Sequence, residues 1–190
     1  MNKAGNNIKR CSWANPKNIL YIDYHDNEWG VEKHDDNELF EMLILEGAQA
    51  GLAWETVLNK RDNYRIAFDN FDPKIVSNYD EQKYEELLQN KGIIRNRLKI
   101  KSAIRNAKVF IEIQKEFASF DNYIWAFVNG KPIVNSFTKE NATATTDISD
   151  IISKDLKKRG MNFVGSTIIY AYMQSIGMVN DHEINCYKHI

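Results

Sequence analysis

Four side chains that could bind a metal ion stand near the two ends of this 190-residue chain. They are Cys11, His25, His182 and Cys186, and the sequence contains 2 cysteines in all. Two thiolates and two imidazoles complete a tetrahedral ligand set for Zn²⁺ and leave no position for water, which is typical of structural zinc. The last two residues are four positions apart and would share one face of a helix, whereas the first two would approach from an N-terminal loop. We predict a structural zinc site that joins residues 1–30 to residues 178–190.

Two other interpretations of these residues remain open at this point. The cysteines could form a disulfide, or the thiols and histidines could be unrelated surface groups. A disulfide needs an oxidising compartment, and residues 1–20 lack the apolar core of an export signal. The longest apolar stretch, residues 168–179, is interrupted by Gln174 and Ser175 and is too short to cross a bilayer. We expect a cytoplasmic protein with no membrane contact.

A second candidate for chemistry is a single carboxylate in the segment Leu-Glu-Gly-Ala-Gln-Ala-Gly-Leu-Ala-Trp at residues 45–54. Here Glu46 interrupts an otherwise apolar helical face, with Trp54 two turns further on. A buried charge is costly, so this carboxylate must be paired, hydrogen-bonded or functional. The structural alternative is a buried glutamate that caps a neighbouring helix or bonds Tyr24.

Basic residues form a third cluster, although the net charge of the chain is only −1. The cluster comprises Lys91, Arg95, Arg97, Lys99, Lys101, Arg105 and Lys108, and the first acid after it is Glu112. A break at residues 90–94 separates two helical patterns, which is the form of a helical hairpin. The backbone N–H groups around Gly92 could then bind a phosphate. The basic side chains would then hold further phosphates of a DNA duplex without reading its sequence. The alternative is a solvated helix face.

The elements that must position these residues are almost all helical. Apolar spacing, N-cap residues and C-terminal glycines predict helices at residues 37–51, 53–68, 73–78, 81–89, 100–117, 120–128, 150–159 and 166–176. Residues 135–147 have no periodicity and are predicted to be an exposed loop, and no strand is long enough to seed a sheet. With 43% hydrophobic residues, the chain can bury a substantial core, so we expect one all-α domain over residues 1–190.

Several motifs carry a resemblance to a known family. They are Cys-Ser-Trp at 11–13, Tyr-His-Asp-Asn-Glu-Trp-Gly at 24–30, Leu-Phe-Glu-Met at 39–42, the segment 45–54, Lys-Lys-Arg-Gly-Met-Asn-Phe-Val-Gly at 157–165 and Val-Asn-Asp-His at 179–182. From Cys11 to Cys186 the chain resembles the 3-methyladenine DNA glycosylase I family. The resemblance implies an all-α helix–hairpin–helix DNA glycosylase fold with a zinc site between the N- and C-terminal segments. It also implies a monofunctional N-glycosylase that flips 3-methyladenine out of alkylated double-stranded DNA and releases the free base by hydrolysis.

The same resemblance assigns roles to individual side chains. The base pocket is expected to comprise Trp13, Tyr21, Tyr24, Glu46 and Trp54. Of these, Glu46 would be the catalytic residue, stabilising positive charge and meeting the amine edge of the base, while the tryptophans would stack and Tyr24 would make a polar contact. For each aromatic ring taken singly, core packing is the alternative.

The DNA-binding residues are assigned in the same way. The rim that faces DNA is expected to comprise Gln49, Gly51 and Leu52, with further contacts from Lys91, Gly92, Arg95, Arg97 and Lys101. Helix–hairpin–helix glycosylases in general carry an aspartate after the hairpin, and none occurs between Gly92 and Phe120 here. Its absence favours a monofunctional enzyme for labile lesions. We expect Lys99 and Lys101 to contact phosphates, since a Schiff-base role requires a desolvated amine.

A function of a different class also remains possible on this scaffold, namely a non-catalytic protein that binds damaged DNA. The carboxylate of Glu46 favours the enzyme, because a binding protein has little reason to place an acid in an apolar cleft. We expect a monomer.

Overall fold

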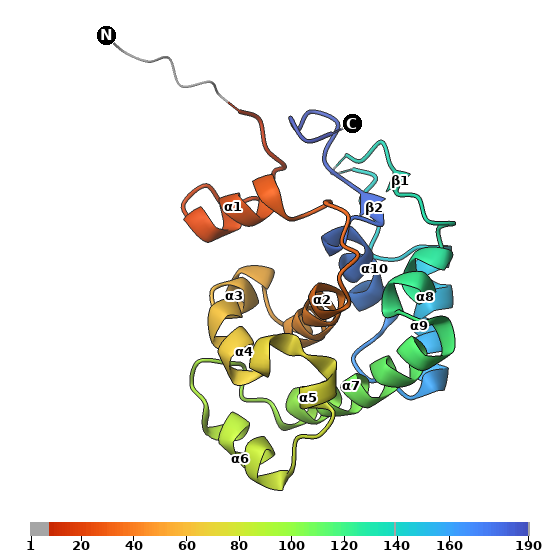
Figure 1. Cartoon of the computed structure of the whole chain (residues 1–190). Coiled ribbons are helices and arrows are strands. Elements are labelled where there is room, and N and C mark those ends of the chain that lie inside the picture. Colours follow the sequence, from red (N-terminus) through yellow and green to blue (C-terminus); the bar gives the residue numbers. More distant parts are fainter. Residues whose placement is uncertain (1–7, 139, 190) are drawn as a thin grey trace.

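The computed structural model describes residues 8–138 and 140–189, and these residues are mostly helical (Figure 1). The described helices are α1 (Ile19–Asn27), α2 (Asp36–Gln49), α3 (Trp54–Leu58), α4 (Arg61–Ala67), the 3₁₀ helix η1 (Asp69–Phe71), α5 (Pro73–Val76), α6 (Glu81–Gln89), α7 (Arg97–Phe117), α8 (Phe120–Ala126), α9 (Asp147–Arg159) and α10 (Ser166–Ser175). The prediction of an all-α chain missed a small parallel sheet. In it, β1 (Ile133–Val134) pairs with β2 (Val179–Asn180).

Local signals explain why most helices begin and end where the sequence predicts. The side chain of Asp35 accepts hydrogen bonds from the first N–H groups of α2, and Asn96 does the same for α7. Helix α9 ends at Gly160, whose φ of 107° suits glycine. Two predictions were wrong. The expected helix at 53–68 is divided into α3 and α4, and α1 lies in the segment expected to be a loop.

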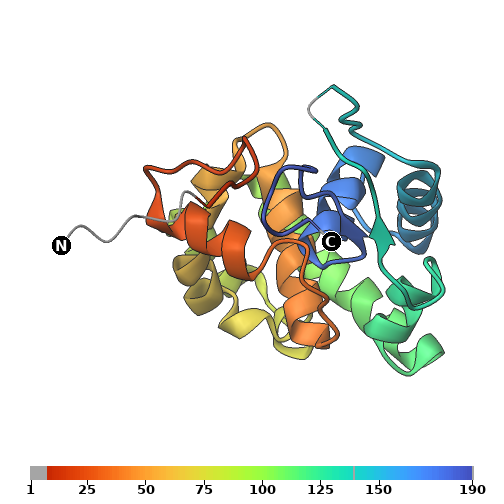
Figure 2. The same cartoon turned by 90° about the horizontal axis from the view of Figure 1, so that it is seen from above.

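Helix α2 occupies the centre of the molecule, between α1 on one side and α8 and α9 on the other (Figures 1 and 2). It packs against α3, α7, α8 and α10. Every residue from Leu39 to Ala48 is buried, so this helix has no solvated face over that length. Glu46 is therefore held on the most enclosed helix of the fold.

The N-terminal and C-terminal segments lie side by side (Figure 1). The backbone N–H of Tyr187 donates to the carbonyl of Lys9 at 2.9 Å, and Phe137 forms a parallel bridge with Glu183. His182 and Cys186 lie in the turns that follow β2, so the prediction that they share a helix face was wrong.

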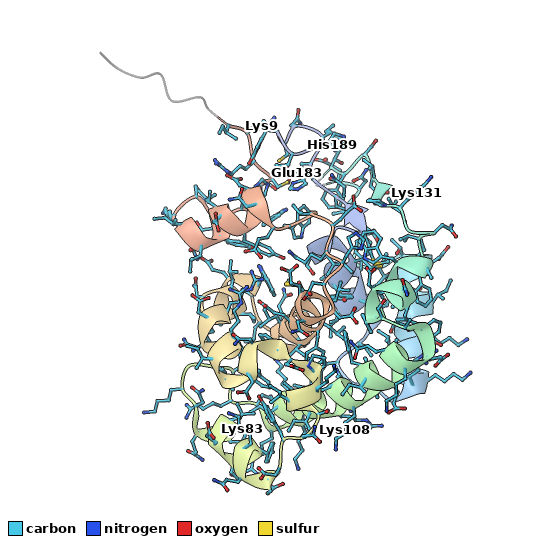
Figure 3. All side chains as sticks on the ribbon, in the orientation of Figure 1. Lys9, Lys83, Lys108, Lys131, Glu183 and His189 are labelled. Atoms are coloured by element: carbon cyan, nitrogen blue, oxygen red, sulfur yellow. The ribbon has the colours of Figure 1, made fainter. Side chains whose placement is uncertain are left out.

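The basic and metal-binding ends of the molecule are well separated. Lys83 on α6 and Lys108 on α7 lie at the opposite end from Glu183 and His189 (Figure 3). Within the described residues, no helix combines the length and apolar character needed to cross a membrane.

Candidate metal centre and aromatic cavity

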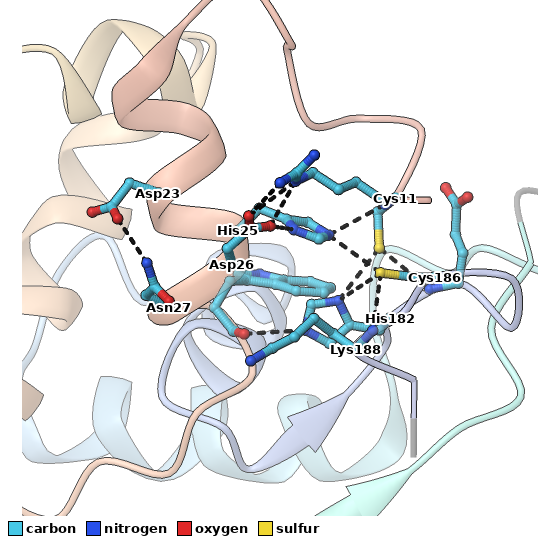
Figure 4. Close-up of polar contacts among 11 residues, drawn as sticks. Cys11, Asp23, His25, Asp26, Asn27, His182, Cys186 and Lys188 are labelled. Atoms are coloured by element: carbon cyan, nitrogen blue, oxygen red, sulfur yellow. Dashed lines mark hydrogen bonds and ion pairs between the residues drawn. The ribbon is translucent and has the colours of Figure 1, made fainter. Parts of the chain in front are cut away.

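The four predicted metal ligands converge at the junction of the two terminal segments (Figure 4). All four are buried, and their donor atoms lie within 4.8 Å of one another. Cys11 Sγ is 3.4 Å from His182 Nδ1, and Cys186 Sγ is 3.5 Å from His25 Nε2. Atoms bonded to one tetrahedral zinc ion lie roughly 3.3–3.8 Å apart, given bonds of about 2.0–2.3 Å. The donor set and its spacing therefore fit a four-coordinate metal ion.

Each histidine is oriented by a hydrogen bond to its other ring nitrogen. His25 Nδ1 lies 2.8 Å from a carboxylate oxygen of Asp26, which the guanidinium of Arg10 holds in turn (Figure 4). His182 Nε2 lies 3.2 Å from the backbone carbonyl of Trp29. Outer partners of this kind select the tautomer that points the free nitrogen at a metal. The site is thus organised beyond its four ligands.

Both cysteines are free thiols in the structure, so it contains no Cys11–Cys186 disulfide. Burial raises the pKa of the Cys11 thiol to about 12 and lowers the pKa of His182 to about 4. Without a nearby cation Cys11 is therefore a neutral thiol at neutral pH, and its thiolate form would need a positive charge beside it. A bound metal ion would supply that charge.

Beside the metal centre, a cavity of about 200 Å³ opens between α1, α2, α3 and α10. All five predicted pocket residues line it, namely Trp13, Tyr21, Tyr24, Glu46 and Trp54. A cavity of roughly 150 Å³ holds benzene, so this one has room for a flat heteroaromatic ring. Tyr24 and Trp54 are also part of the hydrophobic core, and Trp13 and Tyr21 pack against it, so these rings both pack in the core and border the cavity.

The aromatic rings around the cavity contact one another in pairs. Tyr24 and Trp54 have centroids 5.2 Å apart, and Trp13 lies 5.5 Å from Tyr21 and 4.8 Å from Trp29. Their separations and tilts are those of interacting aromatic pairs. The cavity walls are thus mutually supporting.

Glu46 is the acidic residue of this cavity and is 4% exposed. Burial raises the pKa of its carboxyl to about 8, an effect that a hydrogen bond with Ser175 partly offsets. The pKa of Tyr24 is raised well above its usual value by burial and then by the charge of Glu46. The two groups are thus electrostatically coupled within the cavity. Within residues 8–138 and 140–189, Glu46 caps no helix and forms no hydrogen bond with Tyr24, which were the two forms of the structural alternative.

Sequence reasoning missed some residues that line the same cavity. These are Trp29, Phe137, Ala171 and Gln174, while Gln49, predicted at the rim, also lines it. Trp29 lies inside the motif at 24–30, and Gln174 interrupts the apolar stretch of α10. The sequence therefore contained a feature that could have identified each of them as a cavity residue. Phe137 had none, because only the β1–β2 pairing and the bridge to Glu183 bring its segment to the cavity.

The predicted DNA rim is a turn between α2 and α3. Gly51 has a φ of 76°, and the side chain of Leu52 is 40% exposed. Lys99 ties this turn to the start of α7, since its ammonium donates to the carbonyls of Ala48 and Ala50 at 2.7 Å each. The expectation that Lys99 contacts phosphate is therefore replaced by a role in closing the end of α2.

The turn before α7 is already hydrogen-bonded internally. The N–H of Gly92 donates to Asn90 Oδ1 at 2.8 Å, and the N–H of Ile94 donates to the Tyr64 hydroxyl at 3.1 Å. A Cβ on Gly92 would lie 3.0 Å from the Cβ of Asn63, which explains the glycine. The four basic side chains predicted to bind DNA here are all exposed, namely Lys91, Arg95, Arg97 and Lys101. Phosphate contacts here would come from side chains more than from these two amides.

Comparison with known proteins adds independent evidence. The family model described as methyladenine glycosylase matches residues 13–189. DNA-3-methyladenine glycosylase 1 of Escherichia coli (strain K12) is 47% identical over 180 residues, covering 94% of this chain and 96% of that protein.

Solved structures agree with the sequence comparison. A crystal structure of 3-methyladenine DNA glycosylase I superposes with a TM-score of 0.92 at 47% identity, covering 96% of this chain and 100% of that one. A tyrosine-to-phenylalanine variant of 3-methyladenine DNA glycosylase I in complex with 3-methyladenine superposes at 0.91 and 29% identity, with 95% and 97% covered. On this evidence, the chain belongs to the methyladenine glycosylase family.

Proposed function

We propose that this methyladenine glycosylase excises 3-methyladenine from alkylated double-stranded DNA by flipping the base into the aromatic cavity and hydrolysing its N-glycosidic bond. The observation that carries the proposal is the placement of Glu46, a buried carboxyl in a cavity otherwise walled mainly by aromatic rings. Relatives of this chain bear the same activity in their names, and one is described in complex with the base itself.

The chemistry of the lesion fits such a cavity. Methylation at N3 gives the base in DNA a positive charge and weakens its glycosidic bond, so the base leaves as a neutral molecule. The enzyme therefore needs little acid catalysis and must instead recognise a cation. The faces of Trp54 and Trp13 attract a cationic ring, and Tyr24 offers a polar contact at its edge. Normal adenine carries no such charge and gains less from these contacts.

Glu46 is suited to respond to that cation. With a pKa of about 8, its carboxyl holds a proton at neutral pH while the cavity contains no charge. A cation within about 4–6 Å favours the ionised form and lowers the pKa. Entry of the alkylated base would thus release the proton, and the resulting carboxylate would stabilise the positive charge that develops on the sugar as the bond breaks.

The DNA face proposed here surrounds the mouth of the cavity. Leu52 would occupy the gap left by the flipped nucleotide, with Gln49 and Gly51 beside it. Lys91, Arg95, Arg97 and Lys101, which lie around the turn at Gly92 and on α7, would hold phosphates with their side chains. This arrangement is supported by Lys99, which holds the start of α7 against the Leu52 turn.

We assign a helix–hairpin–helix to α6 and α7, and the turn between α9 and α10 offers a second one. Gly165 precedes α10, and no side chain caps the first N–H groups of that helix. Beside this turn, a groove is lined by Lys101, Arg105, Asn162 and Phe163. A DNA backbone placed along the groove would meet both the basic face of α7 and these N–H groups.

The proposed metal is Zn²⁺, bound by Cys11, His25, His182 and Cys186 in a structural role. Bound zinc would hold the N-terminal and C-terminal segments together and thereby keep Trp13 and Trp29 in the cavity wall. We further propose that the protein acts as a monomer, as a single domain, in the bacterial cytoplasm.

The test is release of free 3-methyladenine from methylated duplex DNA. Wild type should release the base, and Glu46→Gln should slow release by roughly 10²-fold or more while DNA affinity changes little. Glu38→Gln is the matched control, because Glu38 is an exposed glutamate on the same helix. Binding of methylated DNA by wild type without base release would refute the enzyme and leave the damage-binding protein.

A further inference from the structure

A buried carboxylate outside the cavity fixes the orientation of one residue inside it. Asp181 is 0% exposed and collects three donors. Asn135 Nδ2 donates to its Oδ1 at 2.7 Å, while the Tyr170 hydroxyl and Gln174 Nε2 donate to its Oδ2 at 2.6 Å each. Both oxygens of this carboxyl therefore accept hydrogen bonds from other side chains.

The orientation of the Gln174 amide follows from this partner. An amide has one donor end and one acceptor end, and Gln174 presents its donor end to Asp181. The carbonyl oxygen Oε1 must therefore point away from Asp181. The backbone of Gln174 is also held, since its carbonyl accepts from the N–H of Gly30 at 3.0 Å. Hydrogen bonds thus hold both the backbone of Gln174 and the amide at the end of its side chain.

The carbonyl oxygen Oε1 of Gln174 is available to a ligand in the cavity, which Gln174 lines. Within residues 8–138 and 140–189, no hydrogen bond ends on Oε1, and this atom is not among the buried polar atoms that lack a partner. Gln174 therefore offers the cavity a hydrogen-bond acceptor whose direction is set by Asp181, and the same cavity holds Glu46.

We propose that Gln174 is a specificity-determining residue, whose carbonyl oxygen accepts a hydrogen from the exocyclic amine of the flipped base and so selects 6-aminopurines over 6-oxopurines. This inference rests on the proposed function. A 6-aminopurine places N–H donors at the position where a 6-oxopurine, such as guanine or hypoxanthine, places an acceptor oxygen. Two acceptors facing each other in a desolvated cavity leave both without a partner.

Glu46 alone does not provide this selectivity. Its carboxyl holds a proton in the uncharged cavity, where it can donate to an oxo group, and once ionised it can accept from an amine. Gln174 has no such second state while Asp181 holds its NH₂ end. Gln174 therefore discriminates between an amine and an oxo group, because it can only accept a hydrogen bond from the base.

The experiment compares the affinities of free 3-methyladenine and free 3-methylhypoxanthine, which differ by the amine and the oxo group. Quenching of tryptophan fluorescence reports binding, since Trp13, Trp29 and Trp54 line the cavity. Gln174→Met keeps the length of the side chain and removes the acceptor. It should reduce the preference for 3-methyladenine by roughly tenfold or more.

Gln114→Met is the matched control, because the Gln114 amide also donates to an aspartate, Asp36, but does not line the cavity. It should keep the wild-type preference. Should Gln174→Met fail to fold, Gln174→Ala makes the same test without a new apolar chain. A preference in the Gln174 variant equal to that of wild type would overturn the inference.

The two proposals fail in distinguishable ways. If wild type releases no 3-methyladenine from methylated DNA, the proposed function is refuted. If wild type releases the base and the Gln174 variant discriminates as well as wild type, only the role of Gln174 is refuted. The substrate consequence is checked in parallel, since Gln174→Met should raise release of 3-methylguanine relative to 3-methyladenine.

Discussion

The indole ring of Trp29 meets the imidazole ring of His182 edge-on, with centroids 4.7 Å apart and planes at 90°. The backbone carbonyl of Trp29 also lies 3.2 Å from His182 Nε2. Trp29 lines the cavity, and His182 offers its other ring nitrogen to the candidate metal centre. Trp29 therefore connects the two sites. The ring of Trp13, which also lines the cavity, lies 5.1 Å from that of His25 at a tilt of 60°. The metal centre thus supports the cavity wall directly.

Loss of a metal ligand should therefore weaken both stability and base binding. We expect one zinc ion per purified chain and its loss in His25→Gln. The variant should be destabilised by several kcal/mol, because the binding free energy of a structural zinc ion adds to that of folding. Metal analysis, thermal unfolding and 3-methyladenine affinity by fluorescence measure the three effects.

The control for this prediction is His34→Gln, which makes the same change at an exposed histidine outside the metal cluster. It should retain zinc and bind the base as wild type does. A metal-free preparation with unchanged thermal stability and unchanged base affinity would contradict the proposed link between the two sites.

The raised pKa of Glu46 predicts a pH dependence of stability. Between its usual value of 4.5 and its folded value of about 8, the folded protein holds a proton that the unfolded chain has lost. Raising the pH through this window therefore lowers the free energy of unfolding, by at most about 5 kcal/mol in total. Glu46→Gln should abolish this decline and be more stable than wild type above pH 8.

Chemical denaturation at a series of pH values measures this effect as the difference between wild type and variant. Glu38→Gln, an exposed position on α2, should follow the wild-type curve. Parallel curves for wild type and Glu46→Gln from pH 4.5 to pH 8 would show that Glu46 titrates normally.

Lys99 is predicted to stabilise the fold through its bonds to the carbonyls of Ala48 and Ala50. Lys99→Met should lower the free energy of unfolding by about 1–3 kcal/mol, because the variant leaves these carbonyls without that partner. Lys108→Met, at an exposed position on the same helix, should have little effect. Urea unfolding of the two variants would decide this, and equal stability would remove the structural role of Lys99.

The exposed basic residues near the start of α7 are predicted to contact phosphates. Arg95→Ala and Lys101→Ala should weaken binding to duplex DNA of any sequence. Each should also reduce the slope of log affinity against log salt by about 0.9. Lys115→Ala changes the far end of α7 and should leave affinity and slope as in wild type. Unaltered DNA binding by the first two variants would contradict the prediction and support the alternative, in which this surface is only a solvated helix face.

The sequence by itself predicted most of the helices and the four residues of the Cys/His cluster. Helix bounds follow from short-range signals, as at α6, where the predicted and observed residues 81–89 coincide because Asp80 caps the first turn. The ligands Cys11 and Cys186 were recognisable because two thiols and two imidazoles have few other joint uses. The five pocket residues were predicted because motifs in the chain resemble those of the 3-methyladenine DNA glycosylase I family.

Only the tertiary structure decided which of these residues act together. No local pattern places Phe137 at the cavity, turns Lys99 onto the end of α2, or aims the amide of Gln174 by means of Asp181. These contacts join residues from different elements, and their directions depend on how the helices pack around α2. Hydrogen-bond partners are fixed by that packing, whereas capping and periodicity are fixed within a few residues along the chain.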